Sequence, residues 1–251
     1  TPLVTGTIDG NNHSLTLNFS GTTAIDGANV TDLGSLTTGG GGLTQLTGNL
    51  TTSGGQTYND AVSLTGATVL TAAAGAGTVT FGNTLNGAQT LGVTGNAVFN
   101  DIVGAGTALT SITVSGTTGI NTTGITTTGN QGYTGMVTLG ADTVLSGNTP
   151  TFTAGVTGAG KDLTLTFTGA TAIDGATFTG IDQLISNGGG TTTLTGNLTT
   201  SGGQTYNDAV SLTGATVLTA AAGAGTVTFG NTLNGAQTLG VTGNAVFGGI
   251  V

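Results

Sequence analysis

The sequence predicts an all-β protein, a right-handed parallel β-helix (β-solenoid) with about 18–19 residues per turn. Three observations predict it: residues that favour strands dominate, short alternating runs recur between glycines, and one repeat accounts for the whole chain. Thr, Val, Gly and Asn are abundant, whereas Glu and Arg are absent and only one Lys occurs. Because helix-favouring surface residues are so scarce, strands are the expected elements.

Short runs of alternating residues supply the strands. Examples are Thr78–Phe81 (TVTF), Leu163–Phe167 (LTLTF) and Val62–Gly66 (VSLTG), in which apolar residues alternate with Thr or Ser. This period of two is typical of a half-buried strand. Glycine interrupts each run and supplies turn positions with positive φ at little steric cost. Since the spacing leaves no room for crossover helices, parallel strands can be joined only by coiling the chain into a solenoid.

An internal repeat with a period of 148 positions organises the chain. Leu46–Phe99 is identical to Leu194–Phe247, and Leu15–Ala28 closely matches Leu163–Ala176. We therefore expect residues 1–148 to be the first copy and residues 149–251 a second, partial copy. We expect both copies to form one continuous solenoid, a segment of a longer tandem array.

The repeat divides again into two modules of about 74 residues. Tyr58, Tyr133 and Tyr206 are the only tyrosines, and each follows a Gln by two positions. We expect about four turns in each module and about thirteen in the chain. At about 4.8 Å per turn, these predict a rod about 60–65 Å long.

The charge balance excludes several classes of function. Charged residues make up 4% of the chain, Lys161 is the only Lys or Arg, and the formal net charge is −9. No basic patch is available to neutralise phosphates, so we expect no nucleic-acid partner. The absence of cysteine removes disulfides and thiolate metal sites. No apolar run approaches the roughly 20 residues that span a bilayer, so we expect no membrane insertion of this segment.

The repeated phrase itself resembles a known family. Thr51–Thr71 (TTSGGQTYNDAVSLTGATVLT), followed by Gly77–Phe99, is similar to the β-strand repeats of filamentous-haemagglutinin-type bacterial adhesins and of autotransporter passengers. The resemblance covers the whole chain, because the repeat does. It implies a long extracellular rod on the bacterial cell surface, exported by two-partner secretion. It also implies a role in adhesion, aggregation or biofilm structure, without catalysis.

The three tyrosines are the candidate contact or packing residues. Tyr58, Tyr133 and Tyr206 could form a stripe on which sugars stack, since aromatic faces bind pyranose rings. One Tyr in each module is sparse for such a track. We instead expect each to be a corner residue that packs once per module and sends its hydroxyl to solvent.

The aspartates predict turns rather than a metal site. Asp60 and Asp208 follow the two identical TYN phrases, but Gly135 stands at this position in the module of Tyr133. Asp26 and Asp174 lie in the shared AIDGA phrase, where Asp-Gly is typical of a turn. The serial nonapeptide of calcium-binding solenoids is absent. We therefore expect no metal and no cofactor, with an incidental surface calcium ion as the alternative.

Catalysis is not expected either. Lys161 aligns with His13 across the 148-position shift, so the two copies would differ in the chemistry of any catalytic pair. His13 is the only histidine and lies in one copy alone. Both residues are typical of variable loops, and we predict that the protein is not an enzyme and has no catalytic residue.

Threonines on the outward side of the strands suggest an alternative function. Thr164 and Thr166 form a T-x-T pattern like that of ice-binding solenoids, although Asn18 replaces the second of them in the first copy. Their simpler role is to favour strands and to give solubility without charge.

Together these features predict a structural repeat segment of a secreted or cell-surface filamentous adhesin. We expect it to associate with other copies of itself, end to end or laterally, and to contact glycans of host or neighbouring cells. The alternative is a carbohydrate-binding or ice-binding solenoid module.

Overall fold

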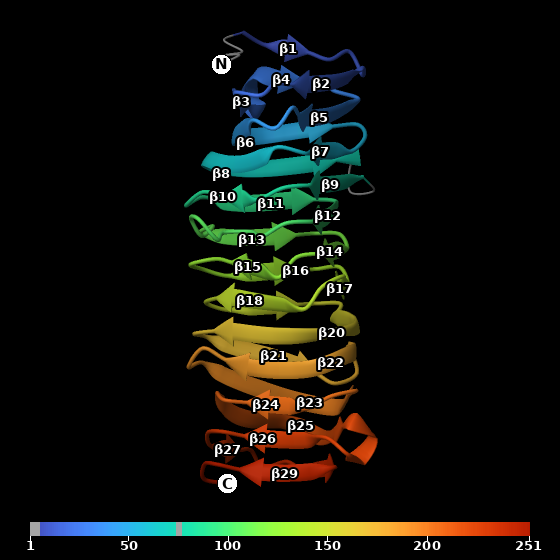
Figure 1. The fold of residues 1–251 in the computed structure, drawn as a ribbon, viewed down its shortest axis with the longest axis vertical. Coiled ribbons are helices and arrows are strands. Elements are labelled where there is room, and N and C mark those ends of the chain that lie inside the picture. The colour runs from blue at the N-terminus through green and yellow to red at the C-terminus, as the bar shows by residue number, and fades with distance from the viewer. Residues whose placement is uncertain (1–5, 74–76) are drawn as a thin grey trace.

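The computed structural model describes residues 6–73 and 77–251. It confirms the predicted fold class: 63% of the chain is strand, and parallel sheets stack as a β-solenoid of about 12 turns. Figure 1 shows one straight column of turns, with the N-terminus at one end and the C-terminus at the other. At about 4.8 Å per turn, the stack is about 55–60 Å long.

Strand pairing divides the solenoid into three parallel faces, named here A, B and C. Face A contains β2 (Ser14–Asn18), β5 (Ser35–Gly39), β7 (Gln56–Tyr58), β9 (Thr78–Phe81), β12 (Asn96–Phe99), β14 (Thr118–Ile120), β17 (Val137–Leu139) and β28 (Leu239–Thr242). Face B contains β1 (Ile8–Asp9), β4 (Val30–Thr31), β11 (Thr90–Thr94), β13 (Ser111–Val114), β16 (Gln131–Tyr133), β19 (Pro150–Phe152), β21 (Ala170–Asp174) and β27 (Leu233–Asn234). Face C contains β3 (Thr22–Asp26), β10 (Leu85–Asn86), β15 (Gly124–Thr126), β18 (Thr143–Gly147), β24 (Gln204–Tyr206), β26 (Thr226–Phe229) and β29 (Asn244–Phe247).

Six longer strands bend across a corner and belong to two faces each. They are β6 (Leu43–Thr52) and β8 (Ala61–Ala72) on faces C and B, β20 (Val156–Phe167) and β22 (Phe178–Asn187) on faces A and C, and β23 (Thr191–Thr200) and β25 (Ala209–Ala220) on faces B and A. Two 3-10 turns, η1 (Gly27–Asn29) and η3 (Ala221–Gly223), complete the described elements. Along the chain, the faces follow one another in the order A, C, B.

The turns vary in length more than the sequence predicts. On face A, the turn from Val79 to its partner Ala97 is shorter than the turn from Gln56 to its partner Val79. The difference arises between Thr71 and Thr78, because their partners in the next turn, Thr94 and Asn96, are only two positions apart in the sequence. Turns are therefore longer on average than the sequence predicts, and about 12 of them use the whole chain.

Corner length determines which face each repeat occupies. Tyr58 lies on face A, Tyr133 on face B and Tyr206 on face C. Each module therefore spans three and two-thirds turns instead of the four turns expected from the sequence. The shift by 148 positions likewise moves every element to a neighbouring face, since β6 lies on faces C and B while its counterpart β23 lies on faces B and A. The second copy thus presents the same surface about a third of a turn around the rod.

Inward side chains stack in columns that fill a single core. One column on face A contains Leu36, Gln56, Val79 and Ala97, which are paired from turn to turn and at most 1% exposed. The buried hydrophobic residues form one cluster that runs from Ile25 to Leu233. Burial of this apolar surface, together with the ladder hydrogen bonds, holds the turns together.

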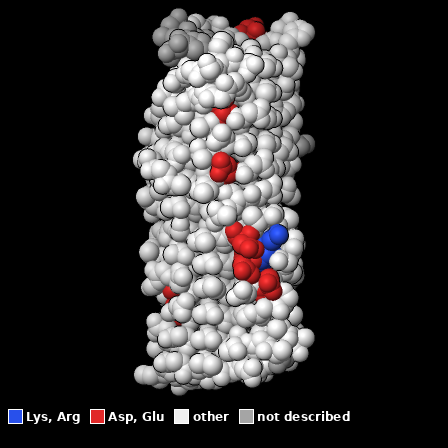
Figure 2. All heavy atoms as spheres, in the orientation of Figure 1, with Lys and Arg blue, Asp and Glu red and all other residues white. Residues whose placement is uncertain are grey.

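The outer surface is nearly free of charge. Figure 2 shows a mostly uncharged face with a few separate acidic patches, the largest of them beside the single cation. In the part of the chain that the structure describes, no helix is long and apolar enough to cross a membrane.

Candidate functional site

The three tyrosines are buried, which corrects the expectation that their hydroxyls reach solvent. The side chains of Tyr58, Tyr133 and Tyr206 are 0%, 1% and 0% exposed. Their hydroxyls donate hydrogen bonds of 2.8, 3.0 and 2.9 Å to the Oε1 atoms of Gln56, Gln131 and Gln204. Gln and Tyr stand two positions apart in a strand and so share its inward side. Because the rings are covered, they offer no face on which a sugar could stack.

Each buried glutamine also ties two turns together. Gln56 Nε2 donates to the carbonyl oxygen of Leu50 in its own turn and to that of Thr71 in the next, at 3.2 and 3.1 Å. The equivalent amides of Gln131 and Gln204 make the same pattern of bonds. A buried amide and phenol are thus paired with each other and with the backbone, which offsets the cost of burying them.

Aromatic rings continue each tyrosine into a short stack. Tyr58 stacks on Phe81 with ring centroids 5.3 Å apart, and Phe81 stacks on Phe99 at 5.4 Å. Tyr206 and Phe229 repeat this arrangement at 5.4 Å in the second copy. The spacing follows from successive turns of a parallel sheet and suits offset-stacked rings. Burial raises the pKa of all three tyrosines well above the usual value.

Asp60 and Asp208 anchor glycine corners of the preceding turn. Asp60 Oδ1 accepts hydrogen bonds from the backbone N–H groups of Gly41 and Gly42 at 2.9 and 3.1 Å. Asp208 Oδ1 accepts from Gly189 at 2.9 Å, and burial raises the pKa of this carboxyl while its hydrogen bonds lower it in part. In the module of Tyr133, a Cβ on Gly135 would lie 2.4 Å from the carbonyl of Gly116, so no side chain fits there.

Asp26 and Asp174 lie in turns, as the sequence predicts. Asp26 Oδ1 accepts from the N–H of Ala28, and Asp174 Oδ1 accepts from that of Ala176, both at 3.0 Å. Within residues 6–73 and 77–251, no group of three or more His, Cys, Asp or Glu side chains is arranged to hold a metal ion.

Lys161 lies next to a row of aspartates whose carboxylates bond to the backbone of the following turn. Asp142 Oδ1 accepts from the N–H of Asp162 at 3.0 Å, and Asp162 Oδ1 accepts from the N–H of Gln183 at 2.9 Å. Each carboxylate therefore caps the backbone of the next turn. Lys161, the only cation, lies beside the largest acidic patch of the face in Figure 2, whereas His13 is an exposed residue close to the N-terminal end of the rod. The structure does not bring the two together.

Thr164 and Thr166 do not continue as a double column of threonine. In the next turn, they pair with Ile185 and Asn187, and in the preceding turn with Val144 and Ser146. The outward surface of face C is therefore mixed at this point.

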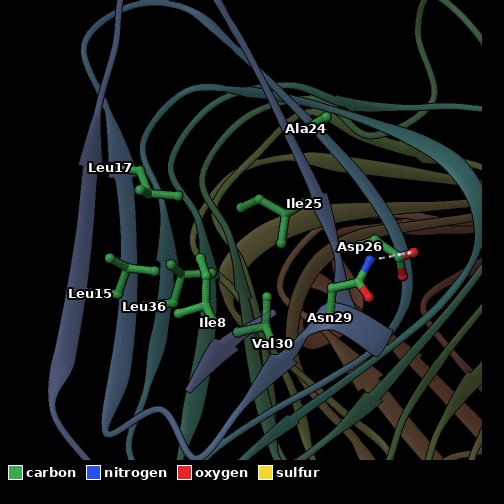
Figure 3. A pocket seen from close by; sticks show the side chains of 9 residues that line it. All are labelled: Ile8, Leu15, Leu17, Ala24, Ile25, Asp26, Asn29, Val30 and Leu36. Carbon is green, nitrogen blue, oxygen red and sulfur yellow. Dashed lines mark hydrogen bonds between the residues drawn. The ribbon is translucent and has the colours of Figure 1, made fainter. Parts of the chain in front are cut away.

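A small apolar pocket lies at the N-terminal end of the core. Figure 3 shows Leu15, Leu17, Ile25 and Leu36 pointing into a common space of about 20 Å³. The counterparts of the first two in the second copy, Leu163 and Leu165, are fully buried because they pair with Thr143 and Leu145 of the preceding turn. In the second copy, side chains of the preceding turn occupy the space that corresponds to this pocket.

Two larger surface grooves are equivalent to each other. The first, groove B, lies on face B and has a volume of about 510 Å³. The second, groove A, lies on face A and has a volume of about 850 Å³. Every residue that lines groove B has a counterpart 148 positions later in groove A. Both volumes fall within the range of small-molecule sites.

Hydroxyl and amide groups line the floor of both grooves. Thr199 of β23 pairs with Thr219 of β25 in groove A, and Thr51 pairs with Thr71 in groove B. Asn197 and Asn49 lie one step further along the same outward sides. These residues are not among the candidate functional residues predicted from the sequence, although the alternation in TGNLTT already places Asn and Thr outward.

Comparison with known proteins identifies no relative. No family model, no curated protein and no solved structure matches this chain.

Proposed function

We propose that this chain is a structural rod segment of a secreted or cell-surface filamentous adhesin. One observation carries the proposal: strand pairing passes from the first copy into the second without a break. Val137 pairs with Val156, and Thr143 pairs with Leu163, across the boundary at residue 148. Each further copy would therefore add length to the same rod.

The surface chemistry supports contact between rods. With charged residues at 4% of the chain, long-range repulsion acts through only a few aspartates. Valines such as Val69, Val144 and Val217 project from the strands and are 39–43% exposed. We propose that copies associate laterally or end to end, in keeping with the resemblance to bacterial adhesin repeats. An extracellular location on a bacterial surface and contact with cell-surface glycans form part of this proposal.

Electron microscopy and sedimentation of the native chain test the proposal. We expect rods that bundle or form filaments as the protein concentration rises, and beads coated with the chain should cluster. Short particles that stay separate at every concentration, with coated beads that remain dispersed, would refute the filament and its adhesive role.

A further inference from the structure

We propose that groove A binds a neutral oligosaccharide. This site specifies the glycan contact of the proposed function and rests on that part of it, whereas the rod itself does not depend on the site. The groove crosses adjacent turns of face A, where the outward residues Gly180, Thr199 and Thr219 follow one another. The ligand would therefore lie along the rod axis, over turns about 4.8 Å apart.

The hydrogen-bonding groups on the floor are free to meet a ligand. Within the described chain, the side chains of Asn197, Thr199 and Thr219 make no hydrogen bond to another residue, and Asn197 and Thr199 are exposed. Their neighbours are already engaged, since Thr200 Oγ1 donates to the carbonyl of Gly202 and Ser201 Oγ donates to Asp182. Hydroxyl and amide groups both donate and accept, which is what a ligand rich in hydroxyls requires.

The chemistry of the walls favours a ligand without charge. None of the described residues that line groove A is ionisable. The nearest charged residues, Lys161 and Asp182, follow the lining residues Gly160 and Ile181 and are opposite in sign, so neither an anion nor a cation gains a net counter-charge. Ala221 and Ala222 supply methyl groups along one side, which can pack against the apolar faces of sugar rings.

Groove A has glycine at two lining positions where groove B has larger polar side chains. Gly160 and Gly180 in groove A replace the exposed Asn12 and Asp32 of groove B. A Cβ on Gly160 would meet no atom within 4 Å, so the space above it is open. Asp32, in contrast, places a carboxylate beside Thr51 in groove B. We therefore assign the oligosaccharide to groove A alone.

The first copy supplies a natural way to close groove A. Gly160 and Gly180 have φ of +79° and +61°, and Asn12 and Asp32 adopt similar values of 60° and 51°. Asn and Asp tolerate this left-handed region better than other residues. The double substitution G160N/G180D should therefore convert groove A into the form of groove B without disturbing the backbone.

Binding is measured by calorimetry with three probes: cellohexaose and maltohexaose as neutral hexasaccharides, and hexagalacturonic acid as the acidic one. We expect at least one neutral probe to bind and the acidic probe to bind at least about tenfold more weakly. In T199V/T219V, the affinity should fall about tenfold or more, as expected for two lost hydrogen bonds. G160N/G180D should weaken binding similarly, whereas the matched change T51V/T71V in groove B should leave it unchanged.

Several results would overturn the assignment. Failure of both neutral probes to bind, equal binding of the acidic probe, or unchanged affinity in T199V/T219V and G160N/G180D would each refute it. Circular dichroism and the particle length measured by small-angle scattering accompany every variant. If the length stays constant while binding is absent, the site fails and the rod function stands.

Discussion

The hydroxyl of Tyr58 donates a 2.8 Å hydrogen bond to Oε1 of Gln56, in the interior of the solenoid. The amide nitrogen of the same glutamine reaches the carbonyl of Thr71 in the next turn. The pair recurs in all three modules, once on each face of the rod. The modules therefore share a buried Gln–Tyr pair that joins two turns through hydrogen bonds.

Replacing Gln56 with Leu should destabilise the protein. The Tyr58 hydroxyl and the carbonyl of Leu50 would each lose a hydrogen bond while still buried, at a cost of about 1–3 kcal/mol each. The free energy of unfolding in urea measures this cost. The double variant Q56L/Y58F should recover part of the loss, because the phenol is then absent. Equal stability of Q56L and the native chain would contradict this role.

The tyrosines should resist ionisation in the folded protein. Burial raises the pKa of Tyr58, Tyr133 and Tyr206 far above the usual value of about 10. Because the folded pKa is higher than the unfolded one, the stabilisation is fully present below about pH 10 and is lost as the pH rises beyond it. Absorbance by tyrosinate should therefore rise only as circular dichroism reports unfolding. Titration near pH 10 with an intact fold would show that the rings are accessible.

Asp208 should make the protein more stable in acid. Burial raises the pKa of its carboxyl, so the folded state binds this proton more tightly than the unfolded state does. Its contribution is fully present below the usual Asp pKa of about 3.9 and is lost as the pH rises through the raised value. The native chain should therefore lose more unfolding free energy between pH 3 and pH 7 than D208N does, because the variant lacks this carboxyl group. Identical pH profiles would refute the prediction.

Gly135 should not tolerate even a methyl group. A Cβ there would lie 2.4 Å from the backbone of Gly116, so Gly135→Ala should cost about 1–3 kcal/mol through overpacking. Gly21→Ala is the matched control, since a Cβ on Gly21 meets nothing within 4 Å and its stability should change by about 0.5 kcal/mol or less. Thermal unfolding of both variants decides the matter. Similar melting temperatures would mean that the corner at Gly135 can relax.

The sequence predicts the solenoid because its signals are local. Alternation in runs such as TVTF specifies strands, and glycines between them specify corners. The face on which a given residue lies cannot be predicted from local sequence. It depends on how much chain each corner uses, and a long turn from Gln56 to Val79 is followed directly by a shorter one from Val79 to Ala97. The periodicity of the tyrosines therefore indicates a module but not the face that each tyrosine occupies.

Burial of the tyrosines had a signal that could have been used. Gln56 and Tyr58 are two positions apart in a strand, so they share a side, and a buried phenol needs such a partner. The grooves had no comparable signal. Groove A differs from groove B at Gly160 and Gly180, which carry no side chain, and these residues approach Thr199 only through turn stacking.

The length of the rod tests the central claim, that tandem copies extend one continuous solenoid. A chain with one more copy of residues 1–148 inserted after residue 148 would gain seven and a third turns. Small-angle scattering should then show the same cross-section and a particle about 35 Å longer. A particle that widens without lengthening, or that behaves as two jointed bodies, would contradict it.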